Sequence, residues 1–222
     1  MHLMSTSKQT VKPSSEQTEL GFERLVFFTD AVMAIAITLL VIDLRLPEIP
    51  QSLAAAELPG QLNDLTPRIV SFVISFAVVG IYWSSHHRYF NYIKRYDGRL
   101  IGLNLVFLLF IVLMPFAASL LGQYSYLPVA VIVYALDVAA TGFSIGAIWW
   151  YASYNHRLVD RTLDRQFIRE RNAIALVIPL IFLASVPFAW LSPLASMVVW
   201  WLTPLAAMLV IRLRKKRPVK RH

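Results

Sequence analysis

The sequence has 222 residues, of which 57% are hydrophobic and only 15% are charged. In soluble domains roughly a quarter of the residues are charged, and a soluble chain of this length could not bury so much apolar surface. The formal net charge is +8, but the basic residues lie between apolar runs, which argues against a nucleic-acid partner. The absence of cysteine excludes disulfides and thiolate chemistry. The composition therefore predicts an integral membrane protein.

Six apolar runs follow one another along the chain, each close to the 20 or so residues that a helix needs to cross a bilayer. They cover residues 22–46, 67–92, 98–121, 128–154, 173–191 and 193–212. The predicted fold class is all-α, a polytopic membrane protein with six transmembrane helices. We expect residues 1–20 to form a flexible cytoplasmic tail, residues 21–213 one membrane domain, and residues 214–222 a basic cytoplasmic tail.

The basic residues predict the orientation of these helices. With six spans, 19 of the 21 Lys and Arg residues fall on one side, and only Arg45 and Arg68 fall on the other. The positive-inside rule makes the basic side cytoplasmic, so both termini are expected there. The opposite side is mildly acidic, either as a cation-attracting mouth or as an ordinary solvated loop. Its acidic residues are Asp43, Glu48, Glu57 and Asp64.

Four polar residues are expected at a similar depth within the first three helices, where ionisable groups are costly. They are Asp30, His86, His87 and Asn104. Thr29 and Trp83 could join them in a hydrogen-bonded latch, and Arg24 could pair with an acid near the interface. A structural latch, a proton-sensing or gating role and a metal site all remain open from the residues alone. Asp137, in the fourth run, is expected to face protein and hydrogen-bond locally, with a role in ion passage as the alternative.

The first run also carries an apolar stripe. Ile35, Leu39 and Ile42 recur at helical spacing, and Thr38 borders them. Nearby alanines would allow other helices to approach closely. From the spacing alone, this stripe is either a packing seam or the lining of a pore.

The first run resembles a known family. Arg24, Phe28, Thr29 and Asp30, followed by Ala-Val-Met-Ala-Ile-Ala-Ile-Thr-Leu-Leu over residues 31–40, are similar to the first-helix signature of the lysosomal potassium channels called transmembrane protein 175. Thr29 replaces the usual serine of this signature and Met33 the usual phenylalanine. The segment from Trp83 to Arg88 also looks like the family, and a single six-helix unit is similar to its bacterial form.

The resemblance implies a homotetramer in a bacterial inner membrane, with potassium ions passing along an axis lined by the first helices. It implies hydrophobic rings of Ile35, Leu39 and Ile42, with Ile35 the narrowest and Thr38 a ring of hydroxyls. Such rings can gate by dewetting. The remaining polar residues would then form the latch that holds the pore helix: Arg24, Thr29, Asp30, Trp83, His87 and Asn104. No cofactor beyond the permeant ion, no metal site and no catalytic residue is expected.

Three other functions are alternatives to the channel. A secondary transporter with an intramembrane His/Asp coupling site would fit the prolines at 115, 179 and 187, although no internal repeat is evident. A membrane enzyme would need a nucleophile motif, a phosphate-binding glycine loop or a metal triad beside the histidines, and the sequence has none of these. A regulatory or scaffold subunit would instead bury Ile35 and Leu39 against helices of its own chain.

Overall fold

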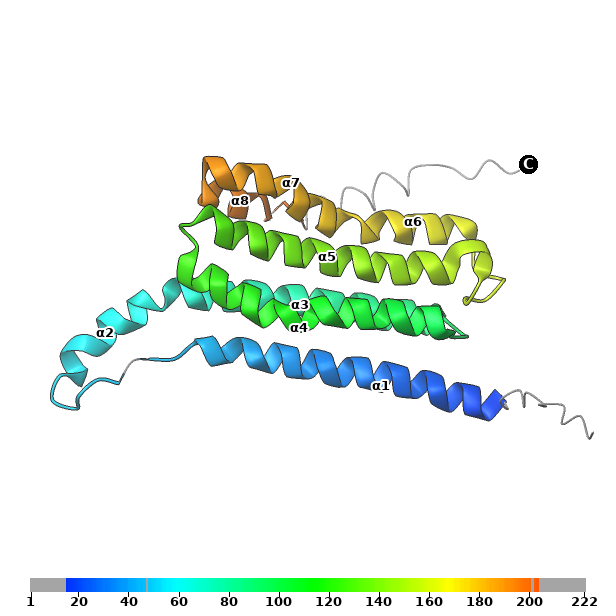
Figure 1. Cartoon of the computed structure of the whole chain (residues 1–222), viewed down its shortest axis with the longest axis horizontal. Helices are drawn as coiled ribbons and strands as arrows, with labels where there is room; N and C mark the ends of the chain where they lie inside the picture. Colours follow the sequence, from blue (N-terminus) through cyan, green and yellow to red (C-terminus); the bar gives the residue numbers. More distant parts are fainter. Residues whose placement is uncertain (1–14, 47, 201, 204–222) are drawn as a thin grey trace, which may run out of the picture.

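The structure, a computed structural model, describes residues 15–46, 48–200 and 202–203. Within these residues the regular secondary structure is helical, apart from one isolated antiparallel bridge between Ile93 and Val159. The long helices lie side by side along the long axis of the molecule (Figure 1). Helix α1 (Ser15–Leu39) forms one edge of this bundle and α7 (Val177–Leu191) lies at the opposite edge. The predicted all-α fold class is confirmed.

The first four predicted helices are present with small shifts of their ends. Helix α1 begins at Ser15, earlier than the predicted start at Phe22, and it ends in a tight turn, η1 (Leu40–Asp43), instead of continuing to Leu46. The next three helices follow the apolar runs closely. They are α3 (Thr66–Tyr92), α4 (Gly98–Tyr124) and α5 (Pro128–Ser153), the last followed by a short turn, η2 (Tyr154–His156).

The fifth predicted helix is longer than expected and is broken. It consists of α6 (Arg165–Ala175) and α7, separated at Leu176. Pro179 explains the break, because its nitrogen has no hydrogen to donate and its ring would clash with the carbonyl of Ala175 in a continuous helix. The apolar pattern missed α6 because this helix is polar and amphipathic, and Phe167 and Ile168 are its only bulky apolar residues before the last turn.

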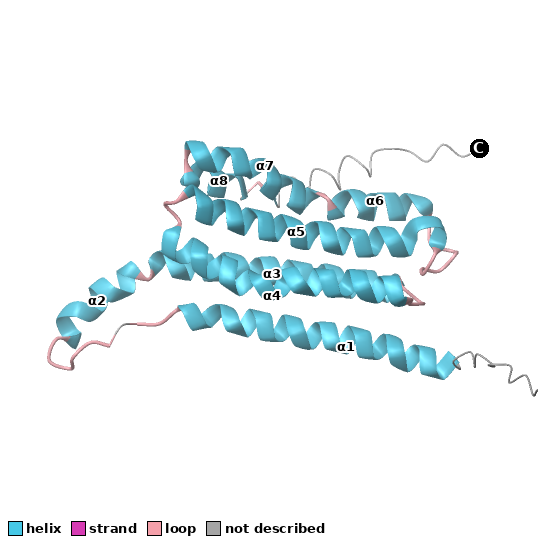
Figure 2. Ribbon diagram, viewed as in Figure 1, coloured by secondary structure: helices cyan, strands magenta, loops and turns pink. Residues whose placement is uncertain are grey.

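Helix α2 (Ala54–Asp64) lies between the first two predicted spans, where the apolar pattern predicts no helix. Pro59 and Gly60, two poor helix formers, stand in its middle. It projects beyond the end of the bundle on the side of α1, as the isolated cyan helix of Figure 1 and the loops around it in Figure 2 show. None of its residues is buried.

Five helical stretches of the described chain are long and apolar enough to cross a membrane. They are Glu19–Asp43, Thr66–Tyr92, Gly98–Tyr124, Pro128–His156 and Arg165–Leu191. The sixth predicted span begins as α8 (Pro193–Trp200), and most of its remaining residues lie outside the described part of the chain.

The α3–α4 and α5–α6 connections are joined at one end of the bundle. Asp97 caps α4 by accepting from the backbone N–H of Leu100 at 2.9 Å, and its other oxygen accepts from the Tyr151 hydroxyl at 2.6 Å. Partial desolvation raises the pKa of the Asp97 carboxyl, but these hydrogen bonds outweigh it and hold that pKa below its usual range. Arg157 donates to the same Tyr151 hydroxyl at 3.0 Å. The α3–α4 connection, predicted to be cytoplasmic, is therefore held against the end of α5.

The core lies mainly between α4 and α5. Its largest fully buried side chains include Phe107, Ile111 and Met114 of α4, and Tyr134 and Trp149 of α5. Helix α1 adds to this core from one side only, through a stripe that includes Met33, Ala36 and Leu40. The four-helix body of α3, α4, α5 and α7 is thus the platform, and α1 is a helix laid against it.

Substitution of Gly142 is expected to destabilise this platform. A methyl group at this position would lie 2.8 Å from the Tyr82 hydroxyl oxygen and 2.9 Å from Cδ of Pro179, closer than packed atoms allow. The rigid proline ring cannot yield easily, so Gly142→Ala should cost about 1–3 kcal/mol of stability. The measurement is the thermal unfolding midpoint in detergent. Gly60→Ala is the matched control, because a methyl group there meets no atom within 4 Å, and equal midpoints for the two variants would contradict the expectation.

Candidate functional site

A directional chain of hydrogen bonds crosses from α3 through α4 to α1. His86 Nε2 lies 3.1 Å from the amide oxygen of Asn104, and the Asn104 amide nitrogen donates to the Thr29 hydroxyl at 2.8 Å. The Thr29 hydroxyl donates in turn to the Leu25 carbonyl at 2.9 Å. Because an amide oxygen can only accept, the geometry places the histidine proton on Nε2. All three side chains are buried, so the chain satisfies polar groups that have no access to solvent.

A second contact holds α1 to α3. The Trp83 indole nitrogen donates to the Asp30 carboxylate at 3.0 Å. The ring of His87 stacks on Trp83, with 5.8 Å between ring centroids, and is otherwise exposed. Asp30 and Thr29 are neighbours in sequence and bind different helices, so together they fix the rotation of α1 about its own axis.

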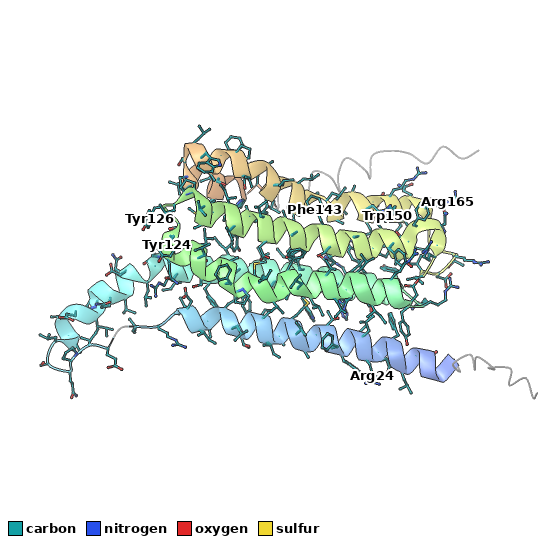
Figure 3. All side chains as sticks on the ribbon, in the orientation of Figure 1. Arg24, Tyr124, Tyr126, Phe143, Trp150 and Arg165 are labelled. Carbon is teal, nitrogen blue, oxygen red and sulfur yellow. The ribbon has the colours of Figure 1, made fainter. Side chains whose placement is uncertain are left out.

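The six predicted latch residues are only partly brought together. Thr29, Asp30, Trp83 and Asn104 share the two contacts above. Arg24 is exposed on the side of α1 that faces away from α4 and α5 (Figure 3), and no described residue lies within hydrogen-bonding or ion-pairing distance of it. His87 contributes only its stacking contact, and His86 occupies the buried position beside Asn104.

A polar stripe along α3 could have singled out His86. Ser71, Ser75, Tyr82 and His86 recur every four or seven residues, which puts them on one face of the helix. All four are buried and each hydrogen-bonds another helix: Ser71 the Ala118 carbonyl, Ser75 the Tyr134 hydroxyl, Tyr82 the Val138 carbonyl and His86 the Asn104 side chain. His87 lies one residue off this face.

The buried His86 ring is further held by aromatic neighbours. It stacks on Phe90 with 3.9 Å between centroids and on Phe107 at 5.7 Å. Its Nδ1 atom is buried and has no hydrogen-bond partner among the described residues. The described residues also contain no group of three His, Cys, Asp or Glu side chains that could hold a metal ion.

The apolar stripe of α1 lies opposite the latch and is uncovered. Ile35 is 59% exposed, Leu39 42% and Ile42 47%, whereas Met33 on the other face is 1% exposed. Thr38 is also exposed, and its hydroxyl donates to the Ile35 carbonyl at 2.8 Å. Since this bond uses the hydroxyl proton, the lone pairs of the Thr38 oxygen remain free to accept. No helix of the described chain packs over this face.

Asp137 lies inside the bundle on α5, with 8% of its surface exposed. Its backbone carbonyl accepts from the Thr141 hydroxyl at 2.9 Å. Its carboxylate oxygen Oδ2 is buried without a hydrogen-bond partner among the described residues. Asp137 thus faces protein, as expected, and the local hydrogen bond involves its backbone and not its carboxylate.

Removal of the Asn104 side chain is expected to loosen α1. Asn104→Ala leaves the buried N–H of His86 without an acceptor and removes a donor from Thr29, at a cost of about 1–3 kcal/mol. The unfolding midpoint in detergent should fall clearly below that of the parent protein. Asn91→Ala is the matched control, because Asn91 is exposed on α3 and its side chain bonds no described residue. A similar midpoint for both variants would argue that the buried chain contributes little.

The chain is similar in sequence to several known proteins of one kind. The family model described as the endosomal/lysosomal potassium channel TMEM175 matches residues 24–115. A potassium channel of Streptomyces collinus is 34% identical over 149 residues, which cover 64% of this chain and 69% of that protein. A potassium channel of Chamaesiphon minutus is also 34% identical, over 153 residues that cover 68% of this chain and 74% of the relative.

The fold has a solved counterpart. The crystal structure of a lysosomal potassium-selective channel TMEM175 homolog from Chamaesiphon minutus matches with a TM-score of 0.73 and 26% identity, covering 86% of this chain and 98% of that one. The matched family segment contains most of α1, all of α3 and most of α4, the three helices that make the buried chain of hydrogen bonds. These relatives are channels, so the expectation of a non-enzymatic protein is confirmed. This chain belongs to the TMEM175 potassium channel family.

Proposed function

We propose that this chain is one subunit of a potassium-permeable cation channel, in which four copies surround a central pore lined by α1. The uncovered apolar face of α1 carries the proposal. In a completed assembly this apolar face must be covered either by lipid or by other copies of the chain. The exposed Thr38 hydroxyl lies in the same region of α1. A scaffold subunit with a closed core would instead have buried Ile35 and Leu39 within its own fold.

The latch gives the uncovered face a fixed direction. Thr29 and Asp30 bind α4 and α3 on one side of α1, so Ile35, Leu39 and Ile42 are held on the other. In a ring of four subunits, each of these positions forms one apolar layer around the axis. Ile35 is proposed as the narrowest layer and the gate, because a narrow apolar throat excludes water and ions until it widens.

Thr38 is the polar group proposed to interact with the permeating ion. Its oxygen retains lone pairs that four subunits would present at one level between the layers of Ile35 and Ile42. A potassium ion stripped of part of its hydration shell could be compensated there without a carbonyl filter. The preference for potassium over sodium would then come from a ring of hydroxyls next to apolar constrictions.

The proposed topology has six spans with both termini in the cytoplasm of a bacterial cell, the sixth span being residues 193–212. It is supported by the five stretches of the described residues that are long and apolar enough to cross a membrane, and by the distribution of basic residues. Residues 21–213 would form the channel domain. The basic segment after Arg212 would lie against the anionic inner leaflet, as polybasic segments do.

The reversal potential tests the function directly. Purified protein in a planar bilayer, with potassium on one side and sodium on the other, is expected to show unitary current steps. Their reversal potential should shift toward the potassium equilibrium value. Steps that reverse near zero would retain a pore but contradict Thr38 and Ile35 as the selective elements. A folded oligomer without any current would contradict the channel itself.

A substitution of Ile35 tests the gate. Ile35→Asn places a polar amide in the narrowest apolar layer, so water should occupy the throat more readily and the open probability should rise severalfold. Single-channel recording measures this effect. Leu136→Asn is the matched control, since Leu136 is an exposed residue of α5 on the far side of α3 and α4. Unchanged gating in a folded Ile35→Asn channel would contradict Ile35 as the gate.

A further inference from the structure

The end of α1 beyond the apolar stripe carries an anchored carboxylate. Asp43, the last residue of η1, accepts at Oδ1 from the Ser119 hydroxyl at 2.8 Å and from the Gln123 amide at 3.3 Å. Gln123 also donates to Ser119 at 2.8 Å, so the three side chains form a closed polar triangle. Both donors belong to α4. One oxygen of Asp43 is thereby held in place, and Oδ2 makes no hydrogen bond with any described residue.

The other acidic residues on this side of the molecule are held differently. Glu48, Glu57 and Asp64 are exposed, and their side chains form no hydrogen bond with the described residues. Flexible exposed carboxylates are well screened by solvent and contribute a diffuse field. Asp43 is half-buried and immobilised, so its charge has a defined position.

Asp43 also stands directly after Ile42, the last residue of the apolar stripe. Its anchors lie on α4, so its side chain is on the flank of α1 and not on the uncovered face. The one basic residue close to it in sequence is Arg45, whose Nε donates to the Ile42 carbonyl at 3.1 Å. No described basic group lies within ion-pairing distance of the Asp43 carboxylate, so its charge is not neutralised by direct contact.

We propose that the Asp43 carboxylate, fixed by Ser119 and Gln123, is the charge that concentrates cations at the outer mouth of the pore. This inference rests on the proposed function, since only a ring of subunits brings four such carboxylates around one axis. The Asp43 carboxylate acts on ions at a distance and binds no ion in the throat of the pore. Selectivity between potassium and sodium is left to the apolar and hydroxyl layers below it.

The physical basis is the local enrichment of counter-ions by fixed charge. Charged walls at a channel mouth raise the local concentration of the permeant ion, and the effect falls steeply with ionic strength. The screening length is about 30 Å at 0.01 M salt and about 3 Å at 1 M salt. A carboxylate on the flank of the mouth should therefore increase the current at low salt and have little influence at high salt. It should act only on ions that enter from its own side.

Substitution of Asp43 by asparagine separates this role from a structural one. The asparagine side-chain oxygen can accept from Ser119 and Gln123 as the carboxylate does, so the polar triangle is retained while the charge is removed. If Asp43 served only to clamp η1 to α4, the variant would conduct like the parent protein. If the charge recruits cations, the current must fall.

The experiment is single-channel recording of the full chain in planar bilayers, at about 0.02 M and about 1 M potassium chloride. Each recorded channel has one orientation, so the two current directions of one molecule serve as an internal comparison. For Asp43→Asn we expect a two- to threefold loss of the current that enters from the Asp43 side at low salt, with both directions unchanged at high salt. Equal conductance of parent and variant at low salt would overturn the inference.

Two further variants control for the sign and the place of the charge. Arg45→Gln removes a positive charge beside Asp43 and should increase the same low-salt current. Glu57→Gln removes an exposed carboxylate of α2, the helix that projects beyond the end of the bundle, and should leave the current unchanged. A loss with Glu57→Gln equal to that with Asp43→Asn would assign the effect to general surface charge and overturn the special role of Asp43.

The parent protein alone offers a second measurement, in case Asp43→Asn fails to assemble. On dilution of the salt, its current from the Asp43 side should fall less steeply than the current from the opposite side. Equal dependence in the two directions would overturn the inference. Absence of unitary currents from the parent protein would overturn the proposed function, and this inference with it.

Discussion

The hydrogen bonds of Asn104 determine how α1 sits on the rest of the protein. Between membrane-spanning helices there is no water to satisfy a polar group, so a buried donor must find an acceptor within the protein. Asn104 meets this demand twice, by accepting from His86 on α3 and donating to Thr29 on α1. With the Trp83–Asp30 contact added, these hydrogen bonds fix the rotational setting of α1 against α3 and α4. The uncovered face of α1 is a consequence of that setting.

Between the buried chain of hydrogen bonds and the Asp43 triangle, α1 is held by apolar packing. Met33, Ala36 and Leu40 fill the interval between the buried chain of hydrogen bonds and the Asp43 triangle. Apolar contacts of this kind have no directional preference, so they permit small changes of tilt that the polar contacts at the two ends limit. A pore lined by such helices could change its radius in the middle while its ends stay attached. The gate proposed at Ile35 lies in this interval, between the two sets of hydrogen bonds.

The platform under α1 is stabilised by close helix approaches. Gly142 lets α5 meet Tyr82 of α3 and Pro179 of α7 at distances that any side chain would prevent. Pro179 in turn interrupts the helix before it, so α6 and α7 separate at Leu176. Since α1 touches mainly α3 and α4, disturbances in α5 or α7 can reach it only through these two helices. The stability of the platform and the position of α1 are therefore separable properties.

The sequence by itself determined the helical segments and the signature of α1. A span of about 20 apolar residues has hardly any alternative to a helix in a membrane, and the run from Arg24 to Leu40 is specific enough to indicate the family. Composition did not reveal α2 or α6, because short amphipathic helices are stabilised by their surroundings and not by their own propensity. Only the tertiary structure decided that His86, and not its neighbour His87, bonds Asn104, since adjacent residues on a helix point about 100° apart. It also decided that Asp43 is anchored to α4, because Ser119 and Gln123 are far from it in sequence and the contact exists only after the helices have packed.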